Sequence, residues 1–270
     1  MFHTRLCKHN EIKSPANAKL EHESHLEFTL LMTSNATSQT DYSLEITSEA
    51  VHYNRWIYDL MRPYLGARVL ELGAGIGVLT PFFLEENRNV MAIDIDARLL
   101  EQHRQRVPAS PRLSVSHIAI QELAAQNAYR QSFDAVVSSN VLEHIPDAME
   151  FEVVAAMSRV LKPGGFAAHW VPALQCIFGS MDVSFGHYRR YQRKTAIALF
   201  RKAGFKIISC EYWNLPGFFG WWLHGRFAHN KSLPPLSTLA FDRYIVPVLR
   251  RVEPWLWRPF GQSLLIVAQR

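Results

Sequence analysis

Short apolar runs alternate with amphipathic runs along this chain from about residue 46 to its end, and that alternation limits the possible folds more than any other feature. Seven of the runs have the length of buried strands, and apolar residues at helical spacing lie between most of them. Strands that alternate with helices are typical of a doubly wound α/β sheet, mostly parallel and covered on both faces. The predicted strands are residues 67–75, 89–95, 112–120, 133–140, 166–173, 205–213 and 263–270.

The size and composition of the chain fit one domain of this kind. Its 270 residues are 48% hydrophobic and 20% charged, which is ordinary for a globular protein with a core. We predict a loose N-terminal arm over residues 1–45 and a single domain over 46–270, with an insertion over 214–262 before the last strand. The 3 cysteines lie far apart and indicate neither a disulfide framework nor a Cys-rich metal site, so no metal is predicted.

The ends and the net charge bear on location and partners. The first residues are polar where a secretory signal is apolar, and no apolar run reaches the roughly 18 residues that a membrane span needs. We therefore expect no transmembrane segment and a cytoplasmic protein, with peripheral contact at a membrane surface as a further option. The formal charge of +5 permits an anionic partner without requiring one. The oligomeric state is left open.

A glycine turn joins the first predicted strand to a helix in the stretch ELGAGIGVLT. Gly73, Gly75 and Gly77 allow a tight turn and a close approach of the backbone to a ligand at the positive end of the helix. Asp94 ends the next strand, where a carboxylate can accept hydrogen bonds from both hydroxyls of a ribose. The order of strand, glycines, helix, strand and acid favours a ribose-containing cofactor over a turn without a ligand.

Four stretches together resemble the class I S-adenosylmethionine-dependent methyltransferases, in particular the type 11 and 12 methyltransferase domains: VLELGAGIGVLT, VMAIDID, FDAVVSSNVLEHIPD and LKPGGFAAHWVPA. They occur in the order and spacing of that family. The resemblance implies a Rossmann-like sheet of seven strands, in which the last strand runs antiparallel between the fifth and the sixth. It also implies that S-adenosyl-L-methionine is the cofactor.

The resemblance also implies roles for single residues. The acid before the glycine turn and the turn itself would hold the methionine end and the ribose side, Asp94 would bind the ribose hydroxyls, and Ile95 would pack on the adenine. Where this family often has an acid for the adenine amino group, this chain has Ile120, so apolar and backbone contacts, or the two polar residues that follow, would hold the adenine. The implied cofactor-binding residues are Glu71, Gly73, Ala74, Gly75, Gly77, Asp94, Ile95, Ile120, Asn140 and Val141.

Methyl transfer to a hydroxyl group is helped by a general base, and two histidines are candidates. His144 follows the fourth predicted strand by a few residues, and His187 lies in the stretch SFGHYRRYQRKT. The alternative for His144 is packing and capping of the following helix, and His169, inside the fifth strand, is interpreted as structural. The Asp/Asn-Pro-Pro-aromatic tetrad of nucleic-acid amino methyltransferases is absent, because SSNV occupies its place. We therefore expect no nucleic-acid partner.

The same basic stretch predicts an acceptor-binding wall. Tyr188, Arg189, Arg190 and Tyr191 follow the fifth strand, on the side of the sheet where ligands bind. Arginine can pair in bidentate fashion with an anionic acceptor group or with carboxylates that fix the loop. A solvated helix start is the alternative interpretation.

The insertion over 214–262 contains four of the seven tryptophans and six Lys or Arg against two acids. Aromatic rings beside arginines suit a boundary between apolar and aqueous surroundings. The insertion is predicted to be a helical cap that packs on the sheet edge, and also a lid over the acceptor or a docking surface for a lipid-like or carrier-linked substrate.

These observations predict an enzyme that methylates a small or lipid-like acceptor, with oxygen as the favoured target atom, in secondary-metabolite, lipid or glycan biosynthesis. A nicotinamide-dependent Rossmann oxidoreductase is one alternative, although the glycine spacing and the lack of a Tyr-x-x-x-Lys pair argue against it. A non-catalytic cofactor-binding scaffold is the other.

Overall fold

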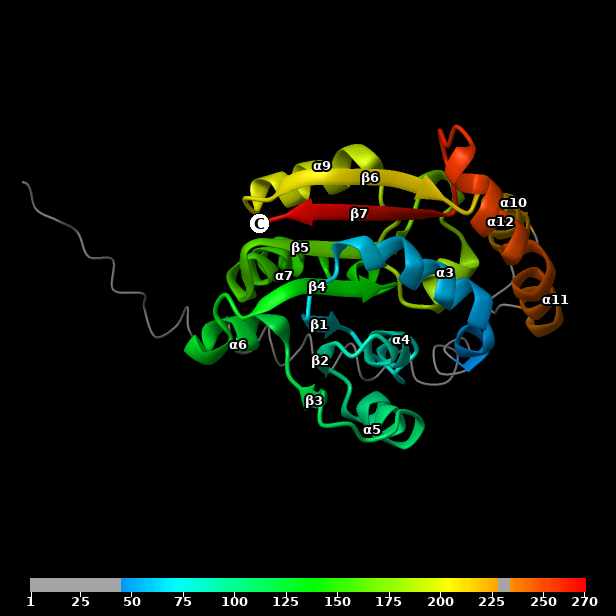
Figure 1. Ribbon diagram of the computed structural model, residues 1–270. Helices are drawn as coiled ribbons and strands as arrows, with labels where there is room; N and C mark the ends of the chain where they lie inside the picture. The colour runs from blue at the N-terminus through cyan, green and yellow to red at the C-terminus, as the bar shows by residue number, and fades with distance from the viewer. Residues whose placement is uncertain (1–44, 228–233) are drawn as a thin grey trace, which may run out of the picture.

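The computed structural model describes residues 45–227 and 234–270. A central sheet crosses the described part of the chain in the order β3-β2-β1-β4-β5-β7-β6 (Figure 1). Strands β1 to β5 pair with one another in parallel. Strand β7 lies between β5 and β6 and runs antiparallel to both. The predicted fold class is therefore confirmed. The strands are β1 (Arg68–Leu72), β2 (Asn89–Asp94), β3 (Leu113–His117), β4 (Phe133–Ser139), β5 (Leu161–Pro172), β6 (Lys206–Trp213) and β7 (Ser263–Gln269).

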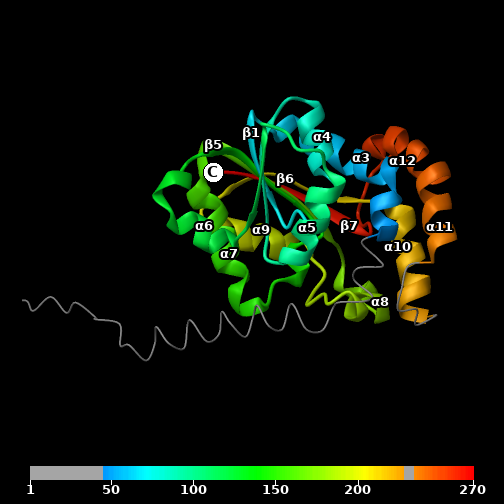
Figure 2. The ribbon, with the colours of Figure 1, turned by 90° about the horizontal axis from the view of Figure 1, so that it is seen from below.

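Helices cover both faces of the sheet because alternate residues of each strand are apolar and point to opposite sides. In β7, Leu264 and Ile266 belong to one core cluster, whereas Leu265 and Val267 belong to the other. The first cluster is completed from α6 (Ile120–Ala125), α7 (Asp147–Val160) and α9 (Arg193–Lys202), and the second from α3 (Val51–Met61) and α4 (Thr80–Glu85) (Figure 2). The remaining helix of the sheet region, α5 (Ala97–Arg106), contacts β2 and β3.

Several local predictions are corrected by the structure. The third strand ends at His117, and Ile120 begins α6. The fifth strand was predicted to begin at residue 166 but β5 begins at Leu161, and Gly164 at φ +80° and a register shift against β4 let the strand bulge. Asp96 caps α5, because its side chain accepts a hydrogen bond from the Arg98 N–H.

The segment between β6 and β7 folds as helices at the end of the sheet where β4, β5 and β6 terminate (Figure 1). Two acids hold it in place. The Asp242 carboxylate accepts hydrogen bonds from the backbone N–H groups of His52 (3.3 Å) and Tyr53 (2.7 Å) in the first turn of α3, and Glu253 accepts one from Leu215 N–H (2.9 Å). Its helices are α10 (Leu215–Trp221), α11 (Pro235–Ala240) and α12 (Val246–Val252).

The predicted arm over residues 1–45 lies outside the described residues except for Glu45. The predicted domain boundaries stay predictions. None of the helices within 45–227 and 234–270 combines the length and the apolar character that crossing a bilayer requires.

Candidate active site

The glycine turn follows β1 and brings the backbone close to the end of β4. Gly73, Gly75 and Gly77 all have positive φ angles, of +66°, +53° and +81°. A Cβ atom on Gly73 would lie 2.5 Å from a methyl group of Val141, whereas one on Gly75 would meet nothing within 4 Å. Gly73 is therefore needed for packing, and Gly75 faces open space where a ligand can approach.

Asp94 ends β2 beside this turn. Its carboxylate accepts hydrogen bonds from the N–H groups of Gly75 (2.8 Å) and Asp96 (2.9 Å). Burial raises the pKa of this carboxyl, and the backbone donors oppose that rise. The acid and the glycine turn are thus held against each other, as a ribose-binding pair requires.

A buried polar chain supports the turn from below. Thr80, the first residue of α4, donates a hydrogen bond to the Glu71 carboxylate (2.5 Å), and its hydroxyl lies 2.8 Å from His103 Nε2. Burial raises the pKa of Glu71 to about 8, and the nearby Asp94 charge adds to that rise while Thr80 opposes it. Glu71 is therefore mainly protonated at neutral pH.

The other predicted cofactor residues surround the same strand ends. Asn140 is exposed at φ +53° directly after β4, and Val141 and Ile95 are half-buried. Ala74 and Ile120 are buried, the latter within the core cluster of α6 and α7. The structure brings all these residues to the carboxyl-terminal edge of the sheet, and their individual cofactor contacts stay predictions.

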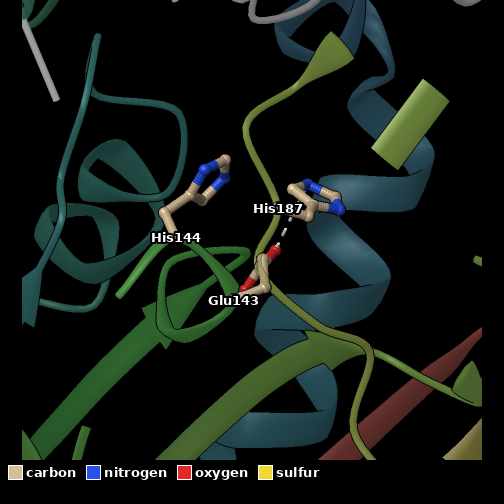
Figure 3. Close-up of side chains that lie close together, drawn as sticks. All are labelled: Glu143, His144 and His187. Carbon is tan, nitrogen blue, oxygen red and sulfur yellow. Dashed lines mark ion pairs between the residues drawn. The ribbon is translucent and has the colours of Figure 1, made fainter. Parts of the chain in front are cut away.

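The two predicted bases meet although 42 residues separate them. His144 ends the short helical turn after β4 and His187 follows α8 (Ser180–Ser184), and their ring centroids are 4.8 Å apart at an angle of 83°. Glu143 lies below both rings (Figure 3), with its Oε1 3.9 Å from His187 Nε2. Glu143 was not among the residues that the sequence predicts. Its only signal there is its place between Leu142 and His144.

Burial sets the protonation of this cluster. It raises the pKa of Glu143 to about 8 and lowers the pKa of His144 to about 3, with a further lowering from His187. Burial also lowers the pKa of His187, although its hydrogen bond to Asp182 opposes the change. Both imidazoles are therefore neutral at pH 7 and offer nitrogen lone pairs.

The basic stretch is largely internal. Arg190 has only 3% of its surface exposed, donates to Asp182 (2.7 Å) and to the Ala173 carbonyl (3.0 Å), and stacks 4.5 Å from the centre of the Trp221 ring. The same Asp182 accepts from His187 Nδ1 (2.9 Å). Arg190 thus fixes the segment that carries His187, and its predicted acceptor contact stays a prediction.

The neighbours of Arg190 divide into two kinds. Arg189 pairs with Asp147 (2.5 Å) and with Glu150 (3.3 Å), and Tyr191 is buried with its hydroxyl 2.5 Å from Glu150. Tyr188 is exposed over 49% of its surface. Of the four predicted acceptor-binding residues, Tyr188 therefore has the most surface available to a substrate. The contacts of all four with an acceptor stay predictions.

Part of this chain is similar in sequence to known proteins. Residues 70–167 match the family model described as a methyltransferase domain. The chain is 33% identical to a ubiquinone biosynthesis O-methyltransferase of Paracidovorax citrulli over 41% of this chain and 45% of the relative. It is 36% identical to the Xanthomonas oryzae pv. oryzae protein of that name over 37% and 41%. The matched stretch therefore spans less than half of these relatives.

Solved structures share the fold at low sequence identity. A methyltransferase of Archaeoglobus fulgidus superposes with a TM-score of 0.53 at 17% identity, over 80% of this chain and 94% of that one. The 1,6-didemethyltoxoflavin-N1-methyltransferase of Burkholderia thailandensis gives 0.55 at 16% identity, over 92% and 89%. Together with the sheet order and the glycine turn beside Asp94, these matches support a class I S-adenosylmethionine-dependent methyltransferase fold for this chain.

Proposed function

We propose that this chain transfers the methyl group of S-adenosylmethionine to a hydroxyl group of a small or lipid-like acceptor, free or linked to a carrier. The observation that carries the proposal is the cluster of Glu143, His144 and His187 beside the strand ends that carry the glycine turn and Asp94. Methyl transfer from a sulfonium needs a positioned acceptor and the exclusion of water, and a hydroxyl also has to lose a proton. Neutral imidazoles suit that task.

Oxygen is the target atom that fits best. An amine is already nucleophilic when neutral, whereas a hydroxyl gains most from a group that takes its proton. The relatives with 33–36% identity over the matched region carry names of O-methyltransferases, which supports the same atom. We assign His144 and His187 to the acceptor hydroxyl and Tyr188 to the outer wall of the acceptor site. The pathway would be secondary-metabolite, lipid or glycan biosynthesis.

Cofactor binding provides the first test. Replacing Asp94 by alanine should weaken the binding of S-adenosylmethionine by about 1–3 kcal/mol, because ribose hydroxyls lose their acceptor. Calorimetry on the wild type, Asp94→Asn and Asp94→Ala measures this, with Asp96→Ala as the control acid two residues away. Unchanged affinity in Asp94→Ala would remove Asp94 from the ribose site. Tighter binding of NAD than of the sulfur compounds would replace the whole proposal by an oxidoreductase.

Methyl transfer itself is tested with a panel of phenols, lipid-linked phenols and carrier-linked hydroxy acids. The expected products are a methyl ether and S-adenosylhomocysteine in equal amounts, detected by mass spectrometry. Methylation of amines alone would refute oxygen as the target. Binding of the cofactor without transfer to any member of a wide panel would favour a non-catalytic scaffold.

The helices between β6 and β7 support docking at an anionic membrane surface. Tyr244, Val248 and Val252 recur every four residues, and Trp255 and Trp257 follow with 87% of their surface exposed. Both acids of this segment, Asp242 and Glu253, are buried as backbone acceptors. Arg243 and Arg251 are exposed, whereas the exposed Arg250 pairs with Asp59, so the outward charge there is positive. Apolar rings beside exposed arginines match a lipid surface with negative headgroups.

Vesicle flotation tests this docking. The wild type should float with vesicles that contain anionic lipid at low salt and remain unbound with purely zwitterionic vesicles. The double variant Trp255→Ala/Trp257→Ala should lose most of this binding, because it removes the two most exposed rings of the surface. Val183→Ala, which removes an exposed apolar side chain from α8, is the matched control. Equal flotation of the double variant and the wild type would refute the surface.

A further inference from the structure

The Glu143 carboxylate is fully buried, and neither of its oxygens has a hydrogen-bond partner among the described residues. A buried carboxyl group whose oxygens have no hydrogen-bond partner is unfavourable even when it is protonated, and a ligand that bonds to those oxygens would relieve this cost. The side chains of His144 and His187 border it, and Figure 3 shows the two rings above the carboxylate. We propose that Glu143, His144 and His187 bind one divalent transition-metal ion, of the zinc or ferrous iron class.

The distances within the cluster favour an ion over a direct hydrogen bond. His187 Nε2 and Glu143 Oε1 lie 3.9 Å apart, which is beyond hydrogen-bonding range. Two ligand atoms bonded at about 2.1 Å to one tetrahedral ion are roughly 3.4 Å apart. One ligand atom from each of the three residues already lies within 4.8 Å of the others. Closing the longest of these separations by about 1.4 Å, through side-chain rotation, would bring all three onto one ion.

The groups around His187 orient it as a ligand. Its Nδ1 is 2.9 Å from the Asp182 carboxylate, which directs Nε2 toward Glu143. Asp182 is itself fixed by Arg190 (2.7 Å) and by the indole N–H of Trp221 (3.0 Å). A carboxylate behind a metal-binding histidine is a recurrent arrangement, because it fixes the tautomer and makes the free nitrogen a better donor. The buried Asp182–Arg190 pair is neutral overall, so the negative charge that a cation would offset comes from Glu143 when the ion displaces its proton.

The chemistry of the donor set selects the class of ion. Two imidazoles and one carboxylate are the ligands of hydrolytic zinc sites and of mononuclear ferrous sites, and they leave coordination positions open. Magnesium and calcium prefer oxygen ligands throughout. The sequence predicted no metal because its cysteines are scattered, but a site without cysteine gives no such signal.

An ion here would act on the acceptor, and this role rests on the proposed function. A hydroxyl bound at an open position ionises more readily, and its proton passes to solvent water. The oxyanion then attacks the methyl carbon as the carbon–sulfur bond breaks, which yields a methyl ether and the neutral thioether S-adenosylhomocysteine. The two histidines then hold the ion instead of taking the proton themselves. Binding of the ion, by contrast, does not depend on the identity of the reaction.

Metal titration of the full chain tests the site. The protein is stripped with a chelator, then titrated with Zn²⁺ by calorimetry and with Co²⁺ by visible absorption. The variants are Glu143→Gln and His187→Asn, with His52→Gln as the control that removes an exposed histidine on α3. The segment before residue 45 contains His3, Cys7, His9, His22 and His25, so the difference between variants, rather than the total bound, is the informative quantity.

The wild type and His52→Gln should bind one equivalent of metal that both cluster variants either lack or bind at least about 10-fold more weakly. Loss of a group that only orients a metal ligand already weakens binding by about 10-fold, so loss of a ligand should weaken it by at least as much. That equivalent should give the absorption of four- or five-coordinate Co²⁺. Identical stoichiometry, affinity and spectrum in all four proteins would overturn the proposal. Circular dichroism checks folding, and His187→Asn alone decides the matter if Glu143→Gln does not fold. Undiminished methyl transfer by a stripped enzyme that binds no ion at the cluster would overturn the metal and leave the proposed function standing.

Discussion

Replacing Arg190 by alanine is expected to destabilise the protein by about 3–5 kcal/mol, the largest effect of any single substitution considered for this chain. Arg190 and Asp182 form an ion pair whose side chains are both fully buried. Removing the guanidinium leaves the Asp182 charge with fewer donors, frees the Ala173 carbonyl from its 3.0 Å hydrogen bond and removes the contact with the Trp221 ring. Urea denaturation at neutral pH, followed by circular dichroism, measures the change.

Arg250→Ala is the matched control for this prediction. Arg250 also pairs with a carboxylate, Asp59, at 2.5 Å, but the two side chains are 37% and 26% exposed. Solvent screens such a pair, so its loss should cost between about 0 and 1 kcal/mol. Equal losses for the two variants would mean that burial of the Arg190 pair has no energetic consequence. The double variant Asp182→Asn/Arg190→Met should recover part of the loss, because it leaves no unpaired charge.

The fold could be predicted because its signals are local. Each strand is a short run with alternate residues for two faces, and the glycines and Asp94 mark the first two strand ends. The predicted start of the fifth strand at residue 166 was wrong for a physical reason. Gly164 can adopt φ +80° inside β5, so residues that usually end a strand here form a bulge. The conformational preferences of proline and glycine indicated a bend before residue 166. Only pairing with β4 and β7 makes the strand continue through that bend.

The candidate site was only partly predictable because its contacts are long-range. Sequence spacing placed His144 near a strand end, but nothing local shows that His187 would lie against it. The arginines of the stretch were predicted to face solvent, to contact the acceptor or to pair with carboxylates that fix the loop, and the sequence did not show which carboxylate or how deeply each is buried. Arg190 is instead buried by Asp182, eight positions earlier, and by Trp221 from α10. A contact between two residues eight positions apart in a loop leaves no periodic pattern in the sequence, so it could not be predicted.

Glu71 should make the stability of the protein depend on pH, and this is the second large effect expected. Its pKa is near 4.5 in an unfolded chain and about 8 in the folded protein, because burial disfavours the charged carboxylate. Between these values the folded state holds a proton that the unfolded state has released, so stability falls as pH rises. From pH 5 to pH 8 the loss assigned to Glu71 should be roughly 3–4 kcal/mol, at 1.36 kcal/mol per pKa unit.

Urea denaturation of the wild type and Glu71→Gln at several pH values between about 5 and 8 isolates this contribution. Glutamine keeps the shape and an acceptor for the Thr80 hydroxyl, so the variant should be folded, and its stability should fall less steeply across this range. Glu143, whose pKa is also raised to about 8, contributes to the slope of both proteins and cancels in the difference. Glu122→Gln, which alters an exposed carboxylate on α6, should follow the wild type. Parallel profiles for Glu71→Gln and the wild type would show that Glu71 is already ionised when the protein is folded.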